Sequence, residues 1–148
     1  MSSFLISRRL SSLLPPVVYL NAFAAQGRWT EGYGQGNFEY FIDQGVMRLY
    51  IGCPTQNGSA DALSNVTVSN LKNDQEVQNF AIKVNGVSYD GPFTAGSRVD
   101  SDNFRSLLEN LRKGNAVVTF GQTSVKFPKS NAAKVIPVGK KMQCNVFW

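Results

Sequence analysis

Apolar and polar positions alternate along much of the chain. Phe38, Tyr40 and Ile42 alternate with residues 39, 41 and 43, which is the period-two pattern of a β-strand. A turn at residues 44–45 follows, so this run predicts a hairpin that returns over residues 46–53. Further runs predict strands or hairpins at residues 66–68, 80–89 and 116–127, and an edge strand or a mobile arm at 29–37.

The apolar period changes to that of a helix beyond residue 101. Four apolar residues fall at i, i+3, i+4 and i+7 and form a single stripe: Phe104, Leu107, Leu108 and Leu111. Ser101 or Asp102 can cap the first turn and Gly114 can end the helix, which predicts a helix over about 102–113. Short strands and one helix predict a mainly β fold with a minor α component. We expect a small antiparallel β-sandwich or a curved sheet with one packed helix.

The N-terminal region has the layout of a secretory signal peptide. Two arginines precede an apolar run at 10–20 and a small-residue site that ends at Ala24. We therefore expect a signal peptide at 1–24, a single β-rich domain at 25–148, and a periplasmic or secreted protein. Prolines at 15–16 interrupt the apolar run, so an ordinary structured N-terminus remains an alternative. An organelle transit peptide is another, because the segment is rich in serine and arginine and lacks acidic residues.

The chain contains two cysteines, Cys53 and Cys144. An even number of cysteines behind a signal peptide indicates a disulfide, which we expect to clasp the domain. Two buried free thiols are the alternative. The chain has no histidine, and two thiolates do not complete a tetrahedral shell, so we expect no metal site.

Charge is unevenly distributed along the chain. Residues 25–103 carry 5 basic and 9 acidic groups, whereas residues 104–148 carry 8 basic groups and 1 acidic group. The two halves either neutralise each other within one sheet or leave a basic face for an anionic partner. We expect that partner to be another protein or an anionic envelope component rather than nucleic acid.

The residue types argue against catalysis. Without histidine or a free thiol, the commonest general base and a common nucleophile are missing, and no P-loop or G-x-S-x-G motif is present. Glu39 and Asp43 share a strand face about 13 Å apart, beyond the ~5–9.5 Å of glycosidase carboxylates. An envelope polysaccharide- or peptidoglycan-acting enzyme using such a pair is the alternative function. Three further aspartates could bind calcium, although their spacing fits no EF-hand loop: Asp90, Asp100 and Asp102. We expect no cofactor.

Binding is the function that the remaining residues favour. The N-terminal part of the domain is rich in aromatic residues, and besides Phe38 we take four of them as candidate contacts: Trp29, Tyr33, Tyr40 and Phe41. We expect Tyr40 or Phe41 to be exposed for contact, unless another element covers them, because the two faces of a half-buried strand cannot both be core. Lys126 and Lys129 are candidate contacts in the basic third, or else part of a solvated face. The sequence predicts an exported, non-catalytic binding module, such as an inhibitor or an immunity-type protein.

The order of elements from Ser101 to Cys144 carries a resemblance. A capped helix is followed by Leu111-Arg-Lys-Gly114, a strand and turn, Ser124-Val-Lys-Phe127, a short segment at 131–136 and a cysteine. This layout resembles the invasion-associated locus B group of bacterial periplasmic proteins. The resemblance implies a small β-sandwich with a disulfide, a bacterial envelope setting and no established catalysis, and it transfers no functional residue.

Overall fold

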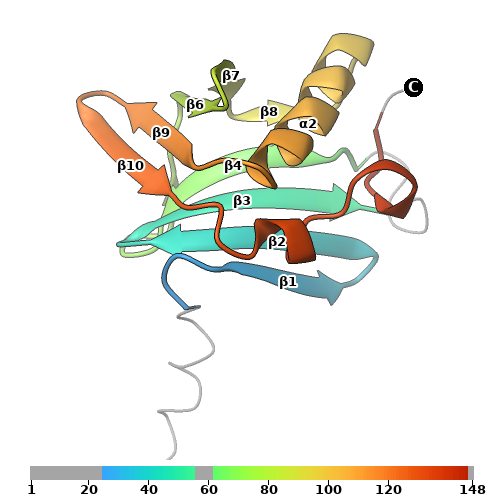
Figure 1. The fold of residues 1–148 in the computed structure, drawn as a ribbon, viewed down its shortest axis with the longest axis horizontal. Helices are drawn as coiled ribbons and strands as arrows, with labels where there is room; N and C mark the ends of the chain where they lie inside the picture. The colour runs from blue at the N-terminus through green and yellow to red at the C-terminus, as the bar shows by residue number, and fades with distance from the viewer. Residues whose placement is uncertain (1–24, 56–61, 147–148) are drawn as a thin grey trace, which may run out of the picture.

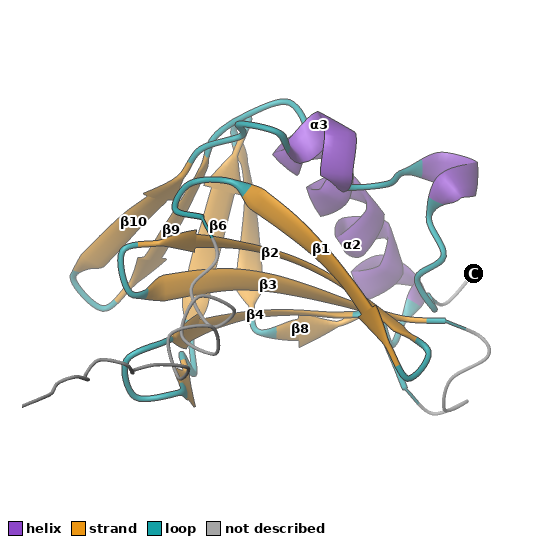
Figure 2. Ribbon diagram, turned by 90° about the horizontal axis from the view of Figure 1, so that it is seen from below, coloured by secondary structure: helices purple, strands orange, loops and turns teal. Residues whose placement is uncertain are grey.

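The computed structural model describes residues 25–55 and 62–146. The expected signal peptide at 1–24 lies outside the described residues. Within them, two antiparallel sheets and a helix, α2 (Arg98–Leu111), enclose the core. The second sheet and α2 lie on the same side of the first sheet (Figures 1 and 2). The mainly β fold with one packed helix is therefore confirmed.

The first sheet has the strand order β1-β2-β3-β4-β5, with β8 also paired to β4. Its strands are β1 (Trp29–Gly34), β2 (Asn37–Gln44), β3 (Met47–Pro54), β4 (Asn65–Asn70), β5 (Gln75–Glu76) and β8 (Phe93–Thr94). The hairpin predicted around residues 44–45 is β2 and β3, in which Ile42 lies opposite Leu49. Both side chains are fully buried, as the period-two pattern requires for one face of a sheet. The stretch at 29–37 forms an edge strand rather than an arm, since β1 pairs with β2 alone.

The second sheet has the strand order β10-β9-β6-β7. Its strands are β6 (Phe80–Val84), β7 (Val87–Gly91), β9 (Ala116–Phe120) and β10 (Thr123–Phe127). Asn85 and Gly86 both have positive φ angles, of 52° and 78°, in the two-residue turn between β6 and β7. These angles belong to a type I′ turn, whose twist matches that of the flanking strands. Both hairpins predicted for this part of the chain are confirmed.

Helix α2 buries the predicted apolar stripe but begins earlier than the sequence indicated. Its N-cap is Ser97, whose hydroxyl accepts the Asp100 N–H at 3.0 Å, so the expectation that Ser101 or Asp102 caps the helix was wrong. Ser101 is buried inside the helix and donates to the Ala95 carbonyl at 3.2 Å. The first turn buries only Ser101 and leaves Val99 68% exposed. It therefore lacks the apolar stripe that marks the rest of the helix.

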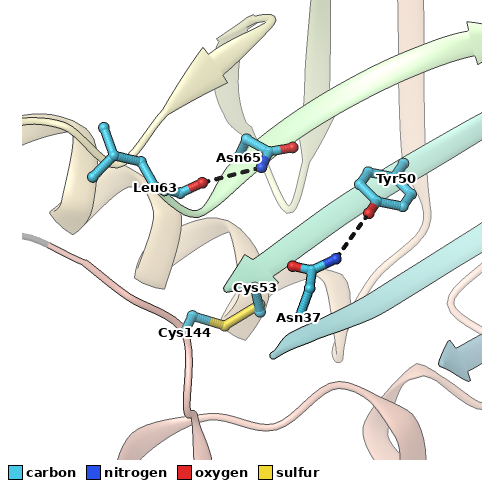
Figure 3. Close-up of a disulfide and its surroundings, with 6 residues drawn as sticks. All are labelled: Asn37, Tyr50, Cys53, Leu63, Asn65 and Cys144. Atoms are coloured by element: carbon cyan, nitrogen blue, oxygen red, sulfur yellow. Dashed lines mark hydrogen bonds between the residues drawn. A yellow bond between two sulfur atoms is a disulfide. The ribbon is translucent and has the colours of Figure 1, made fainter. Parts of the chain in front are cut away.

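After β10 the chain forms two short helical segments, α3 (Ala132–Val135) and η1 (Gly139–Lys141), before the predicted disulfide. Cys53 and Cys144 are joined at an S–S distance of 2.07 Å, which confirms the pairing (Figure 3). The next residue strengthens the attachment, because the Asn145 N–H donates to the Pro54 carbonyl at 2.8 Å. The C-terminal segment is thus fastened to the end of β3.

Candidate binding surface

Two of the aromatic residues expected at a contact surface lie in the core. Trp29 and Tyr40 are each 4% exposed, so the structure corrects the expectation that they meet a partner. The register explains their burial. Trp29 lies opposite Ile42, and side chains two residues apart on a strand share a face, so both aromatics point to the same side as Ile42.

The hydroxyl of Tyr40 reaches the neighbouring strand. Burial, and then the charge of Glu31 and a hydrogen bond to it, raises the pKa of Tyr40 to about 12. Glu31 lies directly opposite Tyr40 in the β1–β2 pair and is exposed. This contact positions the Glu31 carboxylate at the rim of the sheet.

Phe41 lies on the outer face of the first sheet and is half-buried. The guanidinium of Arg48 covers its ring at 4.1 Å from the centroid. The same guanidinium donates to both carboxylate oxygens of Asp43, from Nε at 2.7 Å and from Nη2 at 2.9 Å. Hydrogen bonding to Asp43 raises the pKa of Arg48. Phe41 is therefore packed beneath an ion pair and presents little free aromatic surface.

Tyr33 is the most exposed of the four aromatic candidates, at 62%. It lies opposite Phe38 near the β1–β2 turn, with the two ring centroids 4.5 Å apart. The contact with Phe38 fixes one side of the ring, and the other side remains open to solvent. Tyr33 is therefore accessible at the surface, and its role as a contact residue stays a prediction.

Four of the eight basic residues in 104–148 line a hollow beside β1. The hollow has a volume of about 560 Å³. Its charged lining residues are Glu31, Arg112, Lys134, Lys140 and Lys141, and apolar residues 135–138 complete it. We call this feature the basic hollow. Among the described residues, none of its four cations takes part in an ion pair.

Arg112 is oriented by a hydrogen bond from Nη2 to the Ala133 carbonyl, at 2.9 Å. Its Nε atom is buried and has no hydrogen-bond partner within the described part of the chain. A buried N–H of a charged group without an acceptor is costly. The basic hollow carries a net positive charge, from four cations and one carboxylate among its lining residues.

The two lysines singled out from the sequence lie elsewhere. Lys126 lines a separate hollow beside the β2–β3 turn. Lys129 is exposed on the loop after β10, where its backbone N–H donates to Asn115. The many lysines in residues 104–148 indicated a basic surface. They did not show which lysines lie together in the basic hollow, and the sequence analysis did not single out Arg112. A further hollow of about 570 Å³ is lined by two residues of α2 and four of the C-terminal segment: Arg105, Glu109, Val138, Gly139, Lys140 and Met142.

The acidic candidates are not brought together. Asp43 is engaged by Arg48, and Asp102 pairs with Arg105 at 2.7 Å on the exposed surface of α2. Across residues 25–55 and 62–146, no group of three histidine, cysteine or acidic side chains is placed to hold a metal ion. No helix in the same ranges is long and apolar enough to cross a membrane.

Two antiparallel sheets, one packed helix and a disulfide define a small, mainly β protein with a basic surface hollow. The family model of YfjT matches residues 27–136, which is most of the chain, so the chain belongs to the YfjT family. The matched region includes β1, Arg112 and Lys134. No curated protein and no solved structure shows significant similarity. Nothing in these comparisons links the chain to the invasion-associated locus B group, and that resemblance stays a prediction.

Proposed function

We propose that the protein is an exported, non-catalytic binding module whose basic hollow receives an acidic surface of a partner protein. The observation that carries the proposal is the convergence of four cations, without an ion pair among the described residues, on one hollow. Opposite charge on a partner would relieve their mutual repulsion and would steer the encounter. The apolar lining at 135–138 adds area that a partner side chain can cover.

The proposed mechanism is occlusion by contact, as in an inhibitor or an immunity-type protein. The disulfide supports the exported setting, because such bonds persist in oxidising compartments. A bacterial envelope location is the setting that the predicted resemblance at residues 101–144 implies. The alternative of an enzyme with a catalytic carboxylate pair has weaker support. Asp43, one member of that pair, accepts hydrogen bonds from two nitrogens of Arg48 and is only 1% exposed, so a substrate has little access to it.

Calorimetric titration with polyglutamate tests the charge requirement. We expect Lys134→Glu/Lys140→Glu to weaken binding about tenfold, which is about 1.4 kcal/mol. The matched control is Lys126→Glu/Lys129→Glu, which makes the same change of charge outside the basic hollow and should change binding by less than about threefold. Equal losses in the two variants, or no saturable binding to the unmodified protein, would overturn the proposal.

Export is tested separately by intact mass of the protein recovered from the envelope fraction, before and after reduction and alkylation. We expect cleavage near residue 24 and two cysteines that react with the alkylating reagent only after reduction. An uncleaved chain with two reactive thiols would contradict the exported setting.

A further inference from the structure

The edge of β1 that faces away from β2 is hydrogen-bonded at one end by the side chain of Asn131, in the place where a neighbouring strand would pair. The Trp29 N–H donates to Asn131 Oδ1 at 2.7 Å, and Asn131 Nδ2 donates to the Trp29 carbonyl at 3.0 Å. Asn131 precedes α3, and 102 residues separate the two partners. The side-chain amide of Asn131 thus bonds both the N–H and the C=O group of Trp29 that point away from β2.

Farther along β1, the backbone N–H and C=O groups that point away from β2 have no hydrogen-bond partner among the described residues. Alternate residues of a strand turn their N–H and C=O groups to the same edge, so Glu31 and Tyr33 point theirs in the direction of Trp29. No described residue makes a hydrogen bond to these backbone groups. Such an edge is a template for another strand, and natural proteins usually protect it.

The open edge adjoins the basic hollow. Glu31 belongs to both features, because its backbone faces the edge and its side chain lines the hollow beside Lys134 and Lys140. At the other end of the open segment stands the exposed ring of Tyr33. A strand added to β1 would therefore place alternate side chains toward the cations of the hollow.

We propose that β1 accepts an extended acidic segment of a partner protein as an added strand, with hydrogen bonds to Glu31 and Tyr33 and acidic side chains in the basic hollow. This inference rests on the proposed function and specifies how the acidic partner docks. Main-chain pairing would supply affinity and the hollow would supply selectivity for charge. Asn131 sets the limit of pairing, because it already occupies the position beside Trp29.

Charge favours a partner segment over a second copy of the chain. Pairing β1 with its own copy would bring two basic hollows together, each with four cations and one carboxylate among its charged lining residues. Like charges placed opposite each other are destabilising. An acidic strand meets one carboxylate, that of Glu31, but four cations, so its net interaction with the hollow is attractive.

The test uses a capped peptide of alternating glutamate and valine as the probe, titrated into the oxidised protein. The control peptide has the same sequence with N-methyl groups on two adjacent central residues, which blocks donors on both edges. We expect the control peptide to bind at least about tenfold more weakly. Tyr33→Pro should cause a similar loss, because it removes an outward N–H and leaves the β1–β2 ladder intact. Tyr33→Thr, which keeps the N–H, should stay within about threefold.

The outcomes distinguish strand addition at β1 from the proposed binding of an acidic partner. Equal binding of both peptides, with the loss in Lys134→Glu/Lys140→Glu retained, would overturn strand addition and leave the acidic-partner function standing. Absence of saturable binding for both peptides and for polyglutamate would overturn both. A dimer in sedimentation that Tyr33→Pro abolishes would show that the edge serves a second copy, and would contradict the inference. The peptide comparison decides the matter even where Tyr33→Pro prevents folding.

Discussion

Removal of the Cys53–Cys144 disulfide perturbs both the stability of the domain and the attachment of its C-terminal segment. We consider the double variant Cys53→Ala/Cys144→Ala. Both cysteines are buried, and 91 residues separate them. A cross-link of this kind acts mainly by restricting the unfolded chain, and the restriction grows with the length of the closed loop.

The expected magnitude follows from that separation. In the chain-entropy model, closing a loop of 91 residues stabilises the folded state by about 4–5 kcal/mol at 25 °C. Typical domains have unfolding free energies of about 5–15 kcal/mol, so the loss is a large part of the total. The folded variant retains the hydrogen bonds of Asn145 to Pro54, Ser64 and Ala62, each worth about 1 kcal/mol. We therefore expect a folded but weakened protein.

Urea unfolding followed by tryptophan fluorescence measures the effect, since Trp29 lies in the core. We expect the variant to lose about 4–5 kcal/mol and to show a larger dependence on urea, because its unfolded chain is more expanded. Unmodified protein kept in excess reductant is the control and should unfold close to the variant. A loss below about 2 kcal/mol with an unchanged urea dependence would refute the chain-entropy reasoning.

Three further predictions concern single side chains. The pKa of Tyr40 is raised from 10.0 to about 12, so its stabilising contribution is present below pH 10 and is lost as pH rises through 12. Between pH 10 and 12, the free energy of unfolding of Tyr40→Phe, measured in urea, should fall by about 1–2 kcal/mol less than that of the unmodified protein. An equal fall in the two proteins would contradict this. Asp43→Asn should cost about 2–4 kcal/mol, because it leaves the half-buried Arg48 without its ion-pair partner. A double-mutant cycle with Arg48→Met should give a coupling energy above about 1 kcal/mol, and additive losses would argue against the pair. Asn131→Ala should cost about 1–2 kcal/mol and expose the Trp29 amide to hydrogen exchange, whereas retained protection would show that other groups hold this end of β1.

Local patterns in the sequence were sufficient for the hairpins, and the presence of only two cysteines was sufficient for the pairing in the disulfide. Alternation around Ile42 and the turn chemistry of Asn85-Gly86 act over a few residues, so the chain nearby determines them. The start of α2 was missed because its first turn makes no core contact that a hydrophobic pattern could reveal. Burial of Trp29 was also missed, since its face depends on its register with β2 rather than on its own neighbours.

The basic hollow could not be predicted because long-range contacts create it. Its lining residues come from β1, from the end of α2 and from the C-terminal segment. The contact of Asn131 with Trp29 joins residues 102 positions apart. An excess of lysine in the last third indicated a basic surface, but only the return of the chain past β1 determines which cations converge. The same return explains why Lys126 and Lys129 lie outside the hollow.

The most direct test of an acidic-partner site at the basic hollow is NMR titration of the isotope-labelled, oxidised protein with polyglutamate. We predict that the largest saturable changes in backbone amide shifts fall at residues 31–34 of β1 and at 133–141, with small changes around Lys126 and Lys129. Shifts that are largest at residues 123–129, that spread evenly over the surface, or that fail to saturate by about 1 mM ligand would contradict the account.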